Sequence, residues 1–173
     1  MDEFESRKLE ALEPVFVEAG AALYDCQSFE YAVAYLLYLL SRLGTDGLDV
    51  TRTIAILDDH DKKTAGQLLV MLKKHMKVSD GLEEILSSAL VARNRLIHRY
   101  LIENIERVVD PIERAKLPSE IRALRSLVRK AQEQLAPLIK ELAELADGFS
   151  IDDWSEKLKG DFMLSSSRPP GGV

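Results

Sequence analysis

Apolar residues recur at intervals of three and four along most of this sequence, and no strand pattern of useful length accompanies them. The clearest such stretch runs from Ser79 to about Glu106 and predicts one amphipathic helix. At about 100° per residue, its apolar side chains fall on a single arc, which must be buried against other elements. The arc holds Ile85, Leu86, Ala89, Leu90, Leu96, Ile97, Tyr100 and Leu101. This periodicity constrains the chain to an all-α fold.

Arg93 lies near the middle of this apolar arc, and Asn94 and His98 lie together at one of its borders. A guanidinium buried without a partner is expensive, so its charged end must reach the helix edge or face a site where an anion is expected. We favour the second arrangement, a cleft or a subunit interface, because Asn94 adds an amide and His98 adds an imidazole beside it. A structural Arg/His pair remains the alternative. Arg95 and Arg99 fall on the opposite, polar face.

The rest of the sequence shows the same helical spacing between turn-forming residues. Further helices are expected over residues 3–43, 49–59, 64–76, 118–147 and 151–158. Pro14 either starts a second helix or kinks a continuous one, whereas Pro137 should kink the last long helix without ending it. We predict an all-α, antiparallel helical bundle of four to five main helices. It forms one domain over residues 1–160, followed by a flexible tail over 161–173.

Polar residues mark the starts and ends of two of these helices. Thr64 is suited to cap the helix over 64–76, and the basic residues at the end of that helix include His75. Asp80 and Glu83 have the spacing of a capping box at the start of the next helix. We therefore assign His75 to a helix end and not to catalysis.

Composition and charge limit the classes of protein that fit. The 173 residues are 46% hydrophobic and 30% charged, and the chain has a single cysteine, Cys26, so an internal disulfide is impossible. The N-terminus is acidic and unlike a secretory signal, and the apolar run over residues 31–40 is too short to span a bilayer. We therefore expect a cytoplasmic protein with no membrane association.

The net charge of −6 argues against a protein that coats nucleic acid without specificity. The charge is unevenly distributed, however, because residues 93–130 carry ten basic and five acidic side chains, a net of +5. This excess surrounds Arg93 and suits a local anionic ligand, although part of it is expected to be solvated helix surface.

Two further clusters have a functional and a structural interpretation. The run over residues 58–61, Asp-Asp-His-Asp, resembles a set of metal ligands, but neighbouring side chains at a helix end diverge and no other group completes the set. We therefore expect no metal and no cofactor. Tyr31, Tyr35 and Tyr38 follow one another at helical spacing, which favours packing in the core or at a subunit contact over a base-stacking platform.

The segment Arg93-Asn94-Arg95-Leu96-Ile97-His98-Arg99-Tyr100 resembles the Arg-x4-His motif of the HEPN superfamily. With Tyr100 it is similar to the longer Arg-x4-His-x-Tyr form of the HepT-type toxins. The resemblance covers about residues 9–146. It implies a helical bundle that forms a symmetric homodimer, in which two motif helices face each other across a shared polar cleft.

The same resemblance implies a metal-independent endoribonuclease of a toxin or defence system. His98 would act as general acid or base, Arg93 would stabilise the phosphorane, and Asn94 would orient the imidazole or the phosphate. Further arginines would hold flanking phosphates of the RNA substrate, namely Arg95, Arg99, Arg122, Arg125 and Arg129. A partner nucleotidyltransferase, acting as antitoxin, would adenylylate Tyr100, whose other expected role is packing. The alternative function is a non-catalytic helical dimer that serves as an adaptor or regulatory partner.

Overall fold

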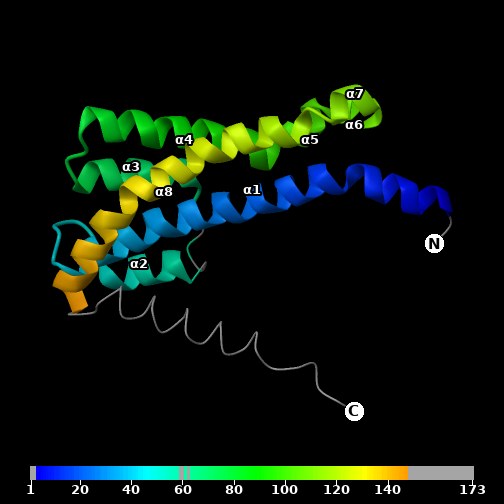
Figure 1. Cartoon of the computed structure of the whole chain (residues 1–173). Helices are drawn as coiled ribbons and strands as arrows, with labels where there is room; N and C mark the ends of the chain where they lie inside the picture. The colour runs from blue at the N-terminus through cyan, green and yellow to red at the C-terminus, as the bar shows by residue number, and fades with distance from the viewer. Residues whose placement is uncertain (1–2, 59–60, 62, 148–173) are drawn as a thin grey trace, which may run out of the picture.

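The computed structural model describes residues 3–58, 61 and 63–147, and over these residues the chain is helical with no strand (Figure 1). The five longer helices are α1 (Glu3–Arg42), α2 (Val50–Leu57), α3 (Ala65–His75), α4 (Asp80–His98) and α8 (Leu117–Asp147). Three short helices precede α8, namely α5 (Tyr100–Glu103), α6 (Ile105–Val109) and α7 (Pro111–Arg114). The prediction of an all-α helical bundle is confirmed.

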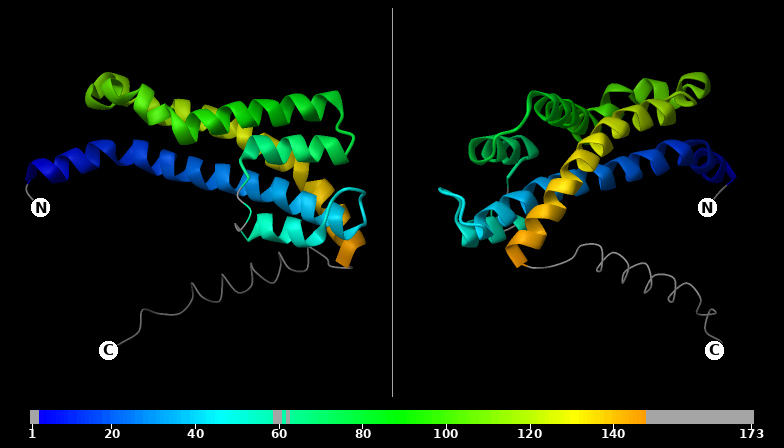
Figure 2. Two further views of the ribbon diagram at one scale, coloured as in Figure 1. Left: turned by 180° about the vertical axis from the view of Figure 1, so that it is seen from behind. Right: turned by 60° about the vertical axis from the view of Figure 1, so that its left-hand side comes forward.

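The five longer helices reverse direction from one to the next, so that the first and the last, α1 and α8, run the same way (Figure 1). In both views of Figure 2, α8 crosses α1 obliquely, and α8 also packs against α4. Both long helices pass through an internal proline without interruption, Pro14 in α1 and Pro137 in α8. The prediction that Pro137 does not end its helix is therefore confirmed.

Two groups of buried side chains form the core. The larger one joins Phe29 and Leu37 of α1 to Leu72 of α3, Leu86 of α4 and Leu135 of α8. The smaller one lies nearer the start of α8 and consists of Val15, Ala22, Tyr100, Leu117 and Ile121. The apolar arc of α4 faces α1 and α8 through these groups, as its periodicity predicts.

Side chains cap four of the described helices, α2, α3, α4 and α7. The Asp49 carboxylate accepts from the backbone amide of Arg52 at the start of α2, and Thr64 forms a reciprocal capping box with Gln67 at the start of α3. The cap of α4 is Ser79, whose hydroxyl accepts from the amide of Leu82. The prediction of a capping box between Asp80 and Glu83 is therefore wrong, because the chain enters the helix one residue earlier.

The prediction of one helix over residues 79–106 is also wrong, because α4 ends at His98. Arg99 leaves the helical conformation with φ −132° and ψ −36°. Beyond it, the Asn104 side chain donates to the carbonyl of Tyr100 at 2.7 Å and accepts from Arg107 at 2.7 Å. Side-chain bonds of this kind offer the backbone an alternative to a continuous helix. The expected connector over 110–117 likewise contains a helix, α7, which Asp110 caps.

The predicted helix over 151–158, the tail over 161–173 and part of the 58–61 run lie outside the described residues. Within the described ranges, no helix is long and apolar enough to cross a membrane.

Candidate functional site

The second half of α4 and the start of α3 enclose a cleft of about 670 Å³. Three of its lining residues, Arg93, Asn94 and His98, are the ones that the sequence pattern selects. Residues four positions apart share one face of a helix, which places the Asn94 amide beside the His98 ring. The other residues that line the cleft are Thr64, Gly66, Val91, Arg95, Arg99 and Glu103.

Arg93 is held by contacts on both sides of its guanidinium. Its side chain is 13% exposed, and its Nε donates to the carboxylate of Glu30 on α1. Its Nη1 lies 2.9 Å from the Asn94 Oδ1 and 3.0 Å from the His98 Nε2. The cost of placing an arginine on an apolar arc is therefore offset by an ion pair from a neighbouring helix, while one nitrogen still faces the cleft.

Glu30 is the residue of this site that the sequence analysis missed. It lies 63 positions before Arg93, so helical spacing within α4 gives no information about it. One signal was present, because Glu30 follows Phe29 and precedes Val33 on the apolar face of α1. A carboxylate beside such a stripe requires a partner just as Arg93 does.

The contact between Arg93 and His98 fixes the hydrogen-bonding role of the imidazole. A guanidinium can only donate, so the His98 Nε2 must accept, and in the neutral ring the proton then lies on Nδ1. His98 and Asn94 are both exposed, in agreement with their place at the border of the arc. The cleft thus places a ring nitrogen that accepts a hydrogen bond beside a guanidinium that Glu30 holds.

Two of the five predicted phosphate-binding arginines, Arg95 and Arg99, line the same cleft. The Arg95 Nε lies 3.5 Å from Glu103 Oε2, and its guanidinium carbon lies 5.7 Å from the centre of the Tyr100 ring. Both arginine side chains are exposed, so their charges face solvent at the mouth of the cleft.

The other three predicted arginines lie on α8. Arg122 and Arg125 both bind Glu18 of α1 at 2.6 Å, and Arg125 also binds Asp25 at 2.8 Å. Burial raises the pKa of Glu18, but the bonds from these two arginines outweigh it and the net pKa is lowered. Carboxylates from α1 therefore compensate part of the positive charge counted in residues 93–130. Arg129 is exposed.

Tyr100 lies in the core and does not face the cleft. Only 2% of its surface is exposed, and its hydroxyl donates to Glu120 Oε2 at 2.9 Å. Burial, with a further contribution from this bond, raises the pKa of Tyr100 to about 12. Arg107 binds the same carboxylate and lowers the pKa of Glu120 to about 2. For Tyr100 to be adenylylated, its hydroxyl would have to leave these contacts.

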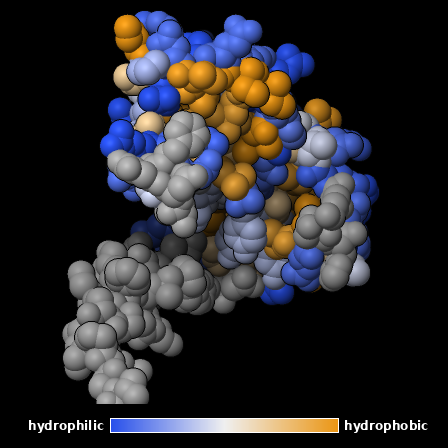
Figure 3. Space-filling view, turned by 90° about the vertical axis from the view of Figure 1, so that its right-hand side faces the viewer, coloured by the Kyte–Doolittle hydropathy of each residue, from blue (hydrophilic) through white to orange (hydrophobic). Residues whose placement is uncertain are grey.

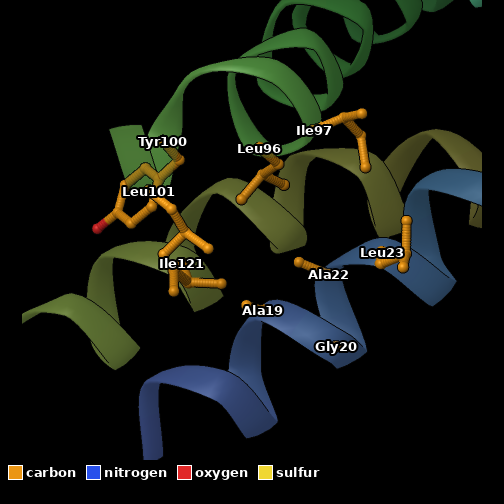
Figure 4. A pocket seen from close by; sticks show the side chains of 9 residues that line it. All are labelled: Ala19, Gly20, Ala22, Leu23, Leu96, Ile97, Tyr100, Leu101 and Ile121. Carbon is orange, nitrogen blue, oxygen red and sulfur yellow. The ribbon is translucent and has the colours of Figure 1, made fainter. Parts of the chain in front are cut away.

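A separate hollow of about 310 Å³ lies between α1, the α4–α5 junction and α8 (Figure 4). Small residues of α1, Ala19, Gly20 and Ala22, leave this space open beneath Leu96 and Ile121. Figure 4 shows that its side chains are apolar apart from the Tyr100 hydroxyl, so it lacks the groups needed for acid or base chemistry. Across the described residues, no group of three or more His, Cys, Asp or Glu side chains is placed to bind a metal ion.

The chain matches no known family model, no curated protein and no solved structure.

Proposed function

We propose that this protein is a metal-independent endoribonuclease and that the cleft at the end of α4 is its active site. The observation that supports the proposal is the contact of one guanidinium, Arg93, with both Asn94 and His98 at an open cleft. This agrees with the Arg-x4-His resemblance, which remains a resemblance of sequence.

In the proposed reaction, a 2′-hydroxyl of the RNA attacks the neighbouring phosphorus and the bond from phosphorus to the 5′-oxygen breaks. Once its contact with the Arg93 Nη1 opens, the His98 Nε2 takes the proton of the 2′-hydroxyl, and the leaving oxygen gains a proton from a second acid. The products are a 2′,3′-cyclic phosphate and a 5′-hydroxyl. Arg93 stabilises the charge that develops on the phosphorane, because its Nη1, when released from His98, can donate to the phosphate while its Nε is held by Glu30.

A second copy of the chain would supply the second acid. A symmetric dimer that pairs two clefts would bring together two His98 side chains in complementary roles. The α5–α7 end of the molecule offers apolar surface, and Figure 3 shows hydrophobic side chains gathered there. Ile102, Ile105, Val109 and Ile112 are among the exposed hydrophobic residues of this end. Exposed apolar patches of this kind mark sites of association.

Arg95 and Arg99 are proposed to hold phosphates on either side of the scissile bond. An RNA role for Arg122, Arg125 and Arg129, and modification of Tyr100 by a nucleotidyltransferase partner, remain predictions from the sequence. They require Arg122 and Arg125 to leave their carboxylates, or Tyr100 to leave the core.

The second candidate is a non-catalytic adaptor, and the exposed apolar residues of α5–α7 favour it. In that case the bond from Arg93 to Glu30 serves only to join α4 to α1. The two functions differ in whether the RNA is cleaved.

The test is incubation of the purified chain with a labelled RNA in the presence of EDTA. The nuclease predicts fragments that end in a 2′,3′-cyclic phosphate, at a rate that EDTA does not change. An RNA that stays intact, or cleavage that EDTA abolishes, would contradict the proposal and favour the adaptor.

A further inference from the structure

Three tyrosines of α1 form a continuous stack along one side of the helix. The ring centres of Tyr31 and Tyr35 are 6.2 Å apart with planes inclined by 8°, and those of Tyr35 and Tyr38 are 5.9 Å apart. These values lie in the range of attractive offset stacking. Tyr35 and Tyr38 are partly buried, whereas Tyr31, at the end of the stack, is 59% exposed. Packing in the core therefore explains the inner rings but does not explain Tyr31.

The exposed Tyr31 ring lies at the edge of a second polar hollow. This hollow has a volume of about 290 Å³ and lies between α1, α2 and the start of α3. Its floor includes the apolar side chains of Leu57 and Leu68, and its polar lining includes Gln27, Glu30 and Lys63. An aromatic face, an apolar floor and hydrogen-bonding groups are what a nucleobase needs for stacking and for contacts at its edge.

Glu30 connects this hollow to the cleft of the proposed active site. It lines the hollow beside Tyr31, and its carboxylate binds Arg93, which lines the cleft. The backbone makes the same connection on the other side, because Lys63 lines the hollow and the next residue, Thr64, lines the cleft. A strand of RNA with a phosphate at Arg93 would thus have a neighbouring nucleotide at Tyr31.

We propose that Tyr31 is a stacking platform for one nucleobase of the RNA, beside the nucleotide that is cleaved. This inference rests on the proposed function, which it deepens by adding a base-binding subsite. Tyr35 stabilises the platform, since it stacks on Tyr31 and limits the orientations of its ring. Stacking engages any base, so the subsite contributes affinity and register, and the amide of Gln27 supplies any preference among bases.

The test uses the His98→Ala protein, which binds RNA without cleaving it, and a fluorescein-labelled RNA of twelve nucleotides. Tyr31→Leu keeps an apolar side chain and removes the aromatic face, whereas Tyr31→Phe keeps the face and removes only the hydroxyl. Loss of one base-stacking contact weakens binding by about 5- to 150-fold, so Leu should lower the affinity within that range and Phe should leave it nearly unchanged. Circular dichroism checks that each variant is folded.

Phe16→Leu is the matched control. Phe16 is also an exposed aromatic residue of α1, and it lies fifteen residues from Tyr31, which is about 22 Å along a helix. Its replacement should not change the affinity for RNA. Equal affinities for the parent, Tyr31→Leu and Phe16→Leu would overturn the inference, and so would equal losses in the two Leu variants.

Three further outcomes distinguish binding of RNA from binding of a free nucleotide, and the stacking platform from the nuclease. Binding of free AMP that depends on Tyr31, with RNA affinity independent of it, would overturn the assignment to RNA. If the wild-type chain cleaves RNA but Tyr31→Leu retains full affinity, the stacking platform is wrong and the nuclease stands. If the His98→Ala parent does not bind RNA and the wild-type chain does not cleave it, both are wrong.

Discussion

Replacement of Glu30 tests whether its bond to Arg93 positions the guanidinium for cleavage or only joins α1 to α4. Glu30→Gln keeps the size and one oxygen acceptor of the side chain but removes its charge. The Arg93 guanidinium would then lose its ionic contact with α1, while its contacts to Asn94 and His98 in the same helix remain possible. We expect a small loss of stability and a larger loss of activity.

The expected magnitude follows from the exposure of the pair. Exposed ion pairs contribute about 0–1 kcal/mol, and breaking a fully buried pair costs about 3–5 kcal/mol. Arg93 and Glu30 are 13% and 26% exposed, which places them between these limits. Because Gln retains an acceptor, we expect Glu30→Gln to lower the free energy of unfolding by about 1–2 kcal/mol. Most domains have 5–15 kcal/mol in total, so the variant should fold.

The effect on cleavage should be greater, because a misplaced guanidinium no longer meets the phosphorane. A loss of about 2–3 kcal/mol of transition-state stabilisation corresponds to a decrease in kcat of about 30- to 150-fold. The assay is single-turnover cleavage of a labelled RNA at saturating enzyme, with urea unfolding followed by circular dichroism on the same samples.

Glu18→Gln is the matched control for this experiment. Glu18 is also a carboxylate of α1, and it binds two arginines of α8 away from the cleft. Its replacement should cost comparable stability and leave kcat unchanged. If Glu30→Gln has full activity, or if the two variants lose activity equally, the positioning role of Glu30 is wrong.

Three other predictions follow from the packing and the charges. Tyr100→Phe removes the hydrogen bond to Glu120 and should lower the free energy of unfolding by about 1 kcal/mol at neutral pH. Because the pKa of Tyr100 is raised from 10.0 to about 12, the contribution of its hydroxyl to stability should be complete below pH 10 and lost towards pH 12. If the stabilities of the wild type and Tyr100→Phe change in parallel between pH 10 and 12, this contribution is wrong. Leu86→Ala should lower the free energy of unfolding by about 2–5 kcal/mol, whereas replacement of the exposed Leu145 by Ala should have little effect. Similar losses of stability in the two variants would show that Leu86 is not a core residue. Arg95→Gln should reduce the salt dependence of RNA binding by about 0.7 in the log–log slope, and an unchanged slope would remove Arg95 from the phosphate contacts.

The elements that could be predicted from the sequence are those that local interactions determine. Thr64 caps α3 through contacts within its own first turn, and the apolar arc of α4 faces the core because helical spacing alone sets that geometry. Arg93, Asn94 and His98 come together for the same reason, since all three lie within six residues of one helix.

The interactions that could not be predicted join residues far apart in the chain. Glu30 and Arg93 are 63 positions apart, and Arg122 and Glu18 are 104 positions apart. Counting charge by segment assigned a positive field to residues 93–130, although carboxylates of α1 bind three of its arginines, Arg93, Arg122 and Arg125. The end of α4 at His98 was also missed, because the apolar spacing continues past Arg99, where the backbone leaves the helical conformation.

Comparison of His98→Ala with His75→Ala tests whether His98 performs proton transfer in RNA cleavage. His75 lies on α3, and its Nδ1 donates to the carbonyl of Asp46 at 3.1 Å, so His75→Ala removes an imidazole without touching the cleft. His98→Ala should reduce single-turnover cleavage by about 10²–10⁴-fold, and His75→Ala should retain the wild-type rate. Full activity of His98→Ala would contradict the account and leave Arg93, Asn94 and His98 as a structural cluster.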